Sequence, residues 1–471
     1  MAFLIGGANS ASGGYEIDNS VRFNQNDHCL TQTFSTSSTS RKKWTFSVWF
    51  KRSNLITSAA LFTAGASGGN DEMTIRLEGH KIDWQEYDVS ASAMDGQLIS
   101  NNLLRDPTAW YHLVCKWDST NGTAGDRMKM YLNGVEITSF ATDNNPSLNY
   151  DSQASNTVLH NVGRQSWNSA SDFDGYMADV NFVNGTALDA SYFGERDEDS
   201  GIWKPKKPDV SAYGANGFFL EFQQTGTSQN SSGIGADTSG NDNHWAVSNL
   251  ASGDITTDTP TNNFCTYNPL DTGSGSTFSE GNLATNTGDN KNDIGTIGFE
   301  NGKWYWEVKA AGSGVVGVQH ESVNHLNGTN LNDDVGSVAY STHHGVIFHN
   351  NNADSSPSSD TDGCIIGCAV DMDNNKIYWH KDGTYIDTSG GTQNPTTAAN
   401  PITVATGTNT SGFWFPKLAS GSSSQTYETN FGNPNFSISS GNSDANGYGN
   451  FEYAVPSGFY AICTKNLAKY G

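Results

Sequence analysis

The stretch Trp110–Ile137, WYHLVCKWDSTNGTAGDRMKMYLNGVEI, contains the strand and turn pattern that indicates the fold class. Apolar and polar residues alternate in two runs, Trp110–Trp117 and Met128–Leu132, with a polar, glycine-containing segment between them. Alternation with a period of two is typical of a strand that buries one face. Asn133-Gly134 follows and supplies the two positive φ angles of a type I′ hairpin turn. The stretch is therefore predicted to form a three-stranded antiparallel meander.

The second half of the chain repeats this plan. Cys364–Val370 is apolar, and the alternating run Lys376–His380 follows after turn-forming residues. Asp382-Gly383 then forms a second tight turn. The 471 residues suit two domains, and 35% apolar residues, 11% aromatics and 51 glycines are typical of strands joined by long loops. We predict an all-β chain of two tandem antiparallel β-sandwiches joined by a polar linker.

Prolines and small polar residues predict the domain boundaries. Residues 1–205 form the first sandwich, which ends in Ile202–Pro208 with two prolines and three lysines. Residues 206–262 are rich in Gly, Ser, Thr, Asn and Asp, and we interpret them as an exposed linker with one short strand, Phe218–Phe222, and a few packed residues such as Trp245. Residues 263–471 form the second sandwich.

Charge and hydropathy argue against several functions. The net charge of −24, from 49 acidic and 25 basic residues, opposes binding to nucleic acid or to an anionic membrane surface. Neither a signal peptide nor an apolar run long enough to cross a bilayer is recognisable, so no membrane insertion is expected. The six cysteines contain no CxxC pair and are interpreted as buried thiols of a protein made in a reducing cytoplasm.

Longer motifs indicate two known families. The first half resembles laminin G-like, concanavalin A-like sandwich domains in KWTFSVWFKR (43–52), AWYHLVCKWD (109–118), MYLNGVEI (130–137) and FDGYMADVNFVNGTAL (173–188). The second half resembles a SPRY domain in GKWYWEVK (302–309), GCIIGCAVDMDNNKIYWHKDGTY (363–385) and FWFPKL (413–418). The resemblance implies two concanavalin A-like or jelly-roll sandwiches, which usually bind glycans or proteins rather than catalyse a reaction.

The order of these domains is similar to that in structural proteins of tailed bacteriophages, and the joining segment adds DTSGNDNHW (237–245) and TPTNNFCTYNPL (259–270) to the likeness. The resemblance implies a virion protein of the tail fibre, tail or head appendage, made in the host cytoplasm. Its expected partners are other virion proteins and a host or environmental glycan, and it is compatible with a homo-oligomer. A decoration protein that binds only virion proteins is the alternative, followed by a polysaccharide depolymerase.

Two acidic pairs have the spacing that a glycosidase could use. Retaining glycosidases need two carboxyl groups about 5–5.5 Å apart. Glu16 with Asp18, and Glu86 with Asp88, lie two positions apart on predicted strands, but neither pair has a further acid two positions on. No Walker A loop is present. We therefore predict that the protein is not an enzyme and requires no cofactor.

A structural calcium ion is expected only through the resemblance. The segment 371–382 begins like an EF-hand loop, but Lys376 replaces the required glycine and strands flank it, so we interpret it as a turn. Concanavalin A-like sandwiches often hold Ca²⁺ with an aspartate from a late strand. Asp179 matches that position, and Asp18 of the first strand could contribute. The rival interpretation is an exposed strand residue paired with a basic neighbour.

A glycan site is expected where aromatic rings border a polar loop, because sugars stack their CH faces on exposed rings. In sandwich lectins, ligands lie on the concave sheet or on loops at one end. The residues predicted to line one groove are Trp84, Tyr87, Asp88, Trp167 and Asn168. In the alternative interpretation Trp84 belongs to the core and Trp167 only covers a loop.

Overall fold

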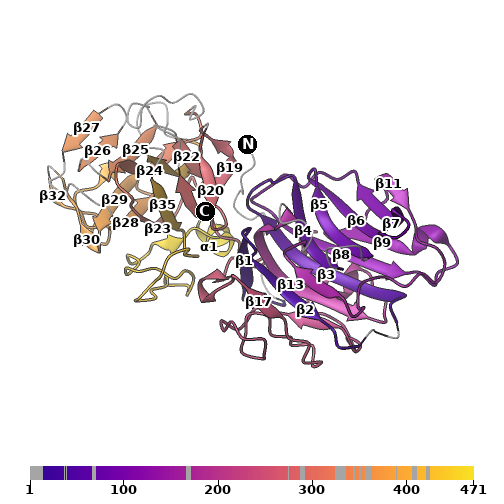
Figure 1. Ribbon diagram of the computed structural model, residues 1–471. Coiled ribbons are helices and arrows are strands. Elements are labelled where there is room, and N and C mark those ends of the chain that lie inside the picture. The colour runs from indigo at the N-terminus through magenta and orange to yellow at the C-terminus, as the bar shows by residue number, and fades with distance from the viewer. Residues whose placement is uncertain are drawn as a thin grey trace. The chain divides into compact units, whose positions relative to one another are not determined.

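The computed structural model describes residues 14–36, 38, 40–65, 71–165, 171–273, 275–286, 292–323, 336–342, 345–349, 352–355, 363–388, 390–405, 411–420 and 425–471. These residues form two compact units, of which the first ends at Thr261 and the second begins at Asn262. Each unit is built from antiparallel sheets (Figure 1), which confirms the predicted all-β fold class.

The first unit contains two eight-stranded sheets. Sheet A has the order β10 (Val135–Glu136), β9 (Met128–Leu132), β8 (Trp110–Asp118), β3 (Lys43–Arg52), β13 (Asp174–Asn184), β1 (Ser20–Asn24) and β18 (Ile255–Thr256), with β16 (Phe218–Leu220) paired to β13. Sheet B has the order β11 (Phe140–Asn144), β7 (Ala93–Ser100), β6 (Lys81–Asp88), β5 (Glu72–Glu78), β4 (Ser58–Ala64), β12 (Leu159–Val162), β2 (Cys29–Thr33) and β17 (Ala246–Ser248).

The predicted meander is confirmed as β8, β9 and β10 at the edge of sheet A. Asn133 and Gly134 have φ angles of 48° and 75°, as the type I′ turn requires. The apolar residues of β8 and β9 that alternate in the sequence enter the core cluster of the sandwich. The pair Asn133-Gly134 thus determines the turn, and the period of two determines which face is buried.

The core of the first unit lies between sheets A and B and is rich in aromatic rings. Trp44 stacks on Trp117 at 5.8 Å between ring centroids and meets Trp84 edge-on at 5.3 Å. All three indoles are fully buried. Aromatic packing of this kind adds about 0.5–1.5 kcal/mol per pair beyond burial of area.

The interpretation of residues 206–262 as an exposed linker is wrong. The predicted strand within Phe218–Phe222 is present as β16 and pairs with β13, and β17 with β2 and β18 with β1 add two further strands to the first unit. Trp245 is fully buried, with its ring centroid 4.8 Å from that of Phe218. The segment's polar composition reflects tight turns rather than freedom, and the first unit extends to Thr261 rather than to residue 205.

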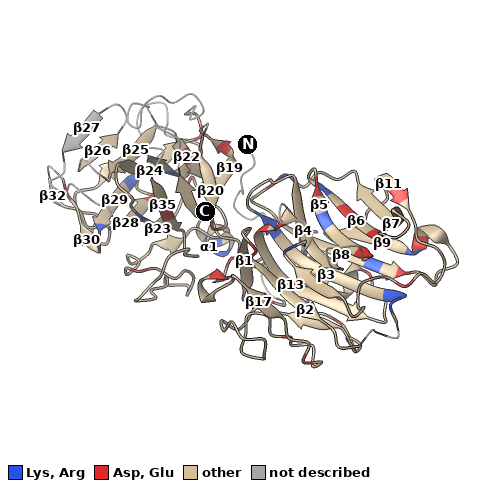
Figure 2. Ribbon diagram, viewed as in Figure 1, with Lys and Arg blue, Asp and Glu red and all other residues tan. Residues whose placement is uncertain are grey.

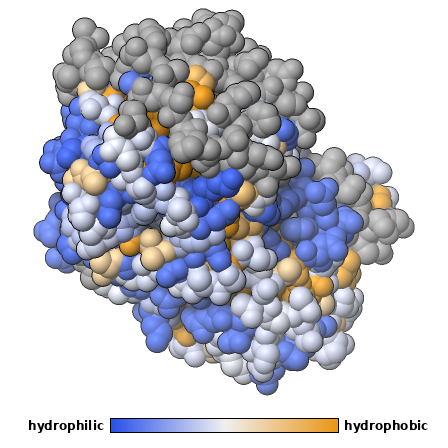
Figure 3. All heavy atoms as spheres, turned by 90° about the vertical axis from the view of Figure 1, so that its left-hand side faces the viewer, coloured by the Kyte–Doolittle hydropathy of each residue, from blue (hydrophilic) through white to orange (hydrophobic). Residues whose placement is uncertain are grey.

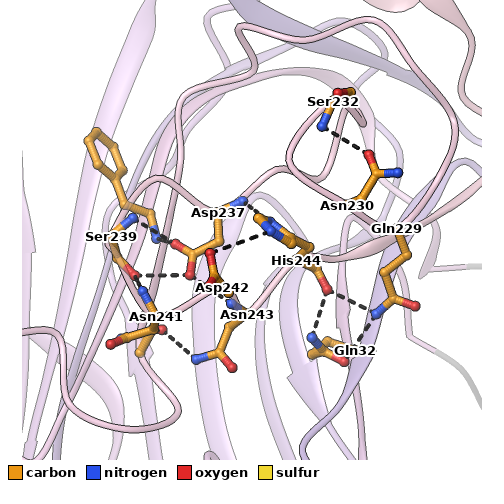
Figure 4. A network of polar contacts seen from close by, with 12 residues as sticks. Gln32, Gln229, Asn230, Ser232, Asp237, Ser239, Asn241, Asp242, Asn243 and His244 are labelled. Carbon is orange, nitrogen blue, oxygen red and sulfur yellow. Dashed lines mark hydrogen bonds and ion pairs between the residues drawn. The ribbon is translucent and has the colours of Figure 1, made fainter.

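The turns of this segment are held by the polar network of Figure 4. The Asp237 carboxylate accepts hydrogen bonds from the backbone N–H groups of Phe219, Ser239 and Asn243, each at 2.9 Å. The backbone oxygen of His244 accepts from the side-chain amides of Gln32 at 2.7 Å and Gln229 at 2.9 Å. Because the side chains bond to backbone groups, the motif DTSGNDNHW builds structure and seats Trp245 in the core.

The second unit also contains two sheets. Sheet C has the order β19 (Tyr267–Thr272), β22 (Asn292–Gly295), β34 (Trp414–Ser420), β24 (Gly314–His320), β25 (Ser337–Ser341), β26 (Val346–His349) and β27 (Asn352–Ser355). Sheet D has the order β20 (Thr277–Ser279), β21 (Ala284–Asn286), β35 (Thr426–Asn430), β23 (Lys303–Lys309), β28 (Ile365–Asp371), β29 (Lys376–Lys381) and β30 (Thr384–Tyr385). β33 (Ile402–Thr403) pairs with β29, and β36 (Tyr460–Ala461) pairs with β23.

A core cluster with Trp304, Trp306, Trp379 and Trp414 fills the second unit. The chain ends in the short helix α1 (Thr464–Tyr470). No helix in the described part of the chain is long and apolar enough to cross a membrane. Outside its grey atoms, the face drawn in Figure 3 is mainly hydrophilic, with hydrophobic residues in small scattered areas.

Candidate functional site

A row of uncharged polar side chains crosses sheet B on the side opposite the core. The strand register joins its seven members, one from each neighbouring strand: Thr31, Asn161, Thr63, Thr74, Gln85, Gln97 and Asn144. We call this set the polar row. Residues next to its members in sequence, such as Trp84 and Leu98, enter the core instead. The row therefore follows from the period of two in every strand that it crosses.

Two atoms in the middle of the polar row have unused hydrogen-bonding capacity. Thr74 and Gln85 are direct cross-strand partners. Thr74 Oγ1 and Gln85 Oε1 are buried and have no hydrogen-bond partner within the described part of the chain. A buried polar group without a partner is destabilising by about 1–3 kcal/mol. Such atoms are expected where water or a ligand supplies the missing bonds.

An ion pair borders the polar row on β5 and β6, where Figure 2 marks residues of both charges. Arg76 Nη2 lies 3.0 Å from Asp83 Oδ2, and Gln97 Nε2 donates to Asp83 Oδ1 at 3.0 Å. Burial raises the pKa of Asp83, while the Arg76 guanidinium and the two hydrogen bonds oppose that rise. The Arg76 side chain is 19% exposed. Arg76 and Gln97 are therefore held in place beside the row by Asp83.

The predicted stacking role of Trp84 is wrong. Its side chain has no exposed surface and packs on Trp44 and Trp117, because the alternation of β6 directs Ile82 and Trp84 into the core. Asp83 and Gln85 take the opposite face of the same strand. The alternative interpretation, in which Trp84 belongs to the core, is therefore the one that the structure supports.

The other residues predicted to bind the glycan lie in different structural environments. Tyr87 is half-buried and pairs with Glu72 and Met94 across the ladder. Asp88 Oδ1 accepts hydrogen bonds from Ser90 Oγ at 2.7 Å and from the Ala91 N–H at 2.8 Å, so it closes the turn after β6. These bonds lower the pKa of Asp88. Trp167 and Asn168 lie outside the described residues.

Glu86 and Asp88 do not form an accessible acid pair. Glu86 has no exposed surface, and its carboxyl accepts from Ser152 Oγ and from the Gln153 N–H. Burial raises the pKa of Glu86 to about 8. Glu86 lies two residues after Trp84, so the alternation of β6 directs it to the same inner face, and the ladder becomes irregular only after Glu86. A carboxyl group so enclosed cannot protonate a glycosidic oxygen.

A serine and a histidine on the outer face of sheet A also fail as a catalytic dyad. Ser47 Oγ lies 2.9 Å from His112 Nε2, and both residues are at most 1% exposed. Trp203 Nε1 donates to His112 Nδ1 at 2.9 Å, which places the ring proton on Nε2. Nε2 is then a donor to Ser47 and cannot remove its proton. Burial also lowers the pKa of His112 to about 3.

Asp179, the residue predicted to hold calcium, is buried in sheet A near Asp18 and Glu221. Asp179 lies at an irregularity in the β13–β3 ladder, has a φ of 45° and is 4% exposed, so the rival interpretation as an exposed residue is wrong. Burial raises the pKa of Asp179 to about 8, while its hydrogen bond to Tyr15 opposes the rise. Asp18 and Glu221 raise it further. Among the described residues, no three His, Cys, Asp or Glu side chains have metal-binding geometry.

The second unit contains a buried polar chain on the outer face of sheet D. Gly383 donates its N–H to His380 Nδ1, so His380 Nε2 donates to the Tyr305 hydroxyl, and that hydroxyl donates to Glu307. Glu307 also accepts the N–H groups of Glu452 and Tyr453 at 2.9 and 2.8 Å. The chain therefore fastens residues 452–453 to the sheet, and we assign it a structural role.

Comparisons with known proteins agree with this architecture. The family model described as the concanavalin A-like lectin/glucanases superfamily matches residues 23–191, and the SPRY domain model matches residues 303–417. No curated protein matches the chain.

Solved structures that match the chain include, among others, three proteins. The SPRY domain of human HERC1 has 17% identity over 35% of this chain and 96% of its own, with a TM-score of 0.27. The SAP-like pentraxin from Limulus polyphemus has 15% identity over 37% and 80%, with a TM-score of 0.28. Mouse laminin alpha1 domains LG4-5 have 11% identity over 89% and 87%, with a TM-score of 0.29.

Domains of these two families are typically binding modules rather than catalysts. Because these two family models match in this order, the chain carries a laminin G-like domain of the concanavalin A-like superfamily, followed by a SPRY domain.

Proposed function

We propose that the chain is a non-enzymatic component of a tailed-phage virion that binds a host or environmental glycan through the polar row of sheet B. The observation that carries the binding part is the row itself, with the partnerless atoms Thr74 Oγ1 and Gln85 Oε1 at its centre. Hydroxyl and amide groups both donate and accept hydrogen bonds, as sugar hydroxyls do. The row thus matches an uncharged, hydroxyl-rich ligand.

The length of the row favours an extended polymer over a single sugar. Neighbouring strands lie about 4.7–4.9 Å apart, so seven strands span roughly 29 Å. Thr31 and Gln97 are half-buried and Asn144 is exposed, whereas Thr63 and Thr74 at the centre are fully buried. A polymer would first meet the outer members of the row, and the buried centre would become accessible only if the segments that cover it open.

The virion part of the proposal is supported by the order of the two domains and by the phage-like segments 237–245 and 259–270. Other virion proteins are the expected partners of the SPRY domain, and the expected location is the particle. A decoration protein that binds only virion proteins is the alternative, and it would not retain a glycan.

A glycan array and retention on insoluble host cell-wall polysaccharide test the proposal with the purified full chain. The double variant Thr74→Val with Gln85→Met removes the two partnerless atoms at nearly constant volume. Two neutral hydrogen bonds at about 1 kcal/mol each correspond to roughly thirty-fold weaker binding. The matched control Gln223→Met changes an exposed glutamine outside the row and should bind as the wild type does.

The outcomes separate the alternatives. Binding by the wild type that the double variant loses, without a decrease in melting temperature, supports the polar row. Equal binding by both proteins would remove the row as the site. Absence of binding to any glycan would favour the decoration protein, and release of soluble sugar from the polysaccharide would reveal a depolymerase.

A further inference from the structure

A lysine and an aspartate far apart in sequence meet in the interior of the first unit. Lys51 of β3 and Asp258, two residues after β18, are separated by 207 positions. Lys51 Nζ contacts Asp258 Oδ2, and the two side chains are only 2% and 0% exposed. Trp110 Nε1 donates to the other carboxylate oxygen, Oδ1, at 3.2 Å.

Aromatic rings surround this pair. The register of sheet A places Trp110, Lys51 and Tyr176 side by side on β8, β3 and β13. Lys51 Nζ lies 4.8 Å from the ring centroid of Tyr176 and 6.0 Å from that of Trp110. Ser20 Oγ donates to the backbone oxygen of Asp258 at 2.6 Å and fixes the segment that carries the carboxylate.

The pair differs from the other lysine–carboxylate pairs of the described residues. In those pairs the lysine side chain is between 20% and 41% exposed, as in Lys43–Asp118, Lys303–Asp371 and Lys309–Glu428. A buried ion pair gives little net stability, because both charges lose their hydration. Burial of Lys51 and Asp258 therefore needs a reason other than stabilisation by the ion pair.

We propose that Lys51 and Asp258 condense into an intramolecular isopeptide bond. The Lys51 ammonium passes one proton to the Asp258 carboxylate, which leaves a neutral amine and a neutral acid. The lone pair of Nζ attacks Cγ, and the Cγ–Oδ2 bond breaks as Oδ2 leaves with that proton and a second one from Nζ. The products are one amide and one water molecule, so neither an oxidant nor a co-reactant is required.

The surroundings supply what this condensation needs. The contact of Nζ with Oδ2 places the nucleophile beside the oxygen that is bonded to Cγ. Reacting groups that are held side by side in the correct orientation react with effective molarities of about 10⁵–10⁸ M. The Trp110 N–H bonds to Oδ1 and stabilises the negative charge that develops there during attack. A water-poor, aromatic site also protects the amide from hydrolysis once water has left.

Mass spectrometry of the folded, full-length chain tests the proposal. The intact protein should be lighter than its sequence by the mass of one water molecule. Proteolysis should yield one branched peptide that joins Lys51 to Asp258, whereas the peptides of Lys43, Lys303 and Lys309 should remain linear and serve as internal controls. Lys51→Arg and Asp258→Asn each remove one of the groups that the stated condensation uses, and Asp258→Ala removes the carboxyl altogether.

The decisive comparison is wild type with Lys51→Arg. Arginine keeps the positive charge but is not an amine nucleophile, so the branched peptide and the mass loss should both disappear. The full sequence mass in the wild type would overturn the proposal and leave a buried ion pair. A loss of water that persists in Lys51→Arg would overturn the isopeptide proposal equally. So would a loss of water that maps to another residue, such as Asp174 in the sequence Asp174-Gly175.

Discussion

The outer faces of the two sheets in the first unit differ in chemical character. On sheet A the outer face is aromatic and enclosed, with Trp49 and Trp110 only 4% and 9% exposed beneath neighbouring segments. On sheet B it carries the polar row, whose members are hydroxyls and amides. We refer to them as the covered face and the polar face.

Polar groups have different hydrogen-bond partners on the covered face and on the polar face. Polar groups of the covered face, such as His112, meet specific partners from distant parts of the chain, so their role is to fasten segments. Two polar atoms of the polar face have no partner within the described residues. Function is therefore expected on the face where hydrogen-bonding capacity remains.

The largest expected effect is on the covered face. Trp49 stacks on His112 at 4.5 Å between ring centroids, and Trp49→Ala should lower the free energy of unfolding by about 3–5 kcal/mol. Ile99→Ala on the polar face, where Ile99 is half-buried, should lower it by about 1 kcal/mol. Denaturant unfolding followed by fluorescence measures both, and equal effects would mean that the two faces are packed alike.

A second difference should appear in the dependence on pH. His112 is buried with a pKa lowered from 6.5 to about 3, so below the unfolded value the unfolded state binds the proton that the folded state does not. Stability should fall as pH decreases from about 6.5 towards 3, by up to about 1.4 kcal/mol per pH unit from this group. His112→Gln should make the decrease between about pH 7 and about pH 5 shallower. An unchanged slope would show that His112 does not contribute.

A smaller effect distinguishes two glutamines of the polar face. Gln85→Met removes an acceptor without a partner and should change stability by less than about 1 kcal/mol, in the stabilising direction. Gln97→Met removes the donor to Asp83 and should destabilise by about 1.5–3 kcal/mol, because a bond to a charged group is lost. Calorimetric melting temperatures rank the variants, and the opposite ranking would contradict the assignment of partners.

The smallest effect is expected from a chelator. The Asp179 carboxyl is buried and accepts a hydrogen bond from Tyr15, and the described residues show no metal-binding group of three. We therefore expect EDTA to leave the melting temperature unchanged. A decrease that Asp179→Asn abolishes would restore the calcium prediction.

Sequence alone predicted those features that depend on one strand at a time. The alternation in Trp110–Trp117 and the pair Asn133-Gly134 determined a meander that the structure confirms. In β6 the same alternation places Trp84 in the core and Gln85 on the opposite face, so periodicity argued against Trp84 as a stacking residue. A preference for aromatic residues in a ligand site thus outweighed the simpler periodicity signal.

The rest required pairing information that a sequence does not carry. The polar row exists only because the registers of seven strands bring Thr74, Gln85 and Gln97 into line. The strands of the misassigned linker contain two or three residues each, too few for any periodicity to be visible. Its only signals were the apolar run at Phe218 and the single Trp245.

The pairing of β1 with β18 has a mechanical consequence. Ser20, the first residue of β1, lies opposite Thr256, the last residue of β18, so tension applied to the two ends of the unit would pull this ladder open one bond at a time. Asp258 lies beyond β18 and is held to Lys51 of β3. A force from the C-terminal side meets that anchor before it reaches the ladder. Side-chain contacts at this end, Asp258 with Lys51 and Thr261 with Ile17, therefore bear such a force before the strands do.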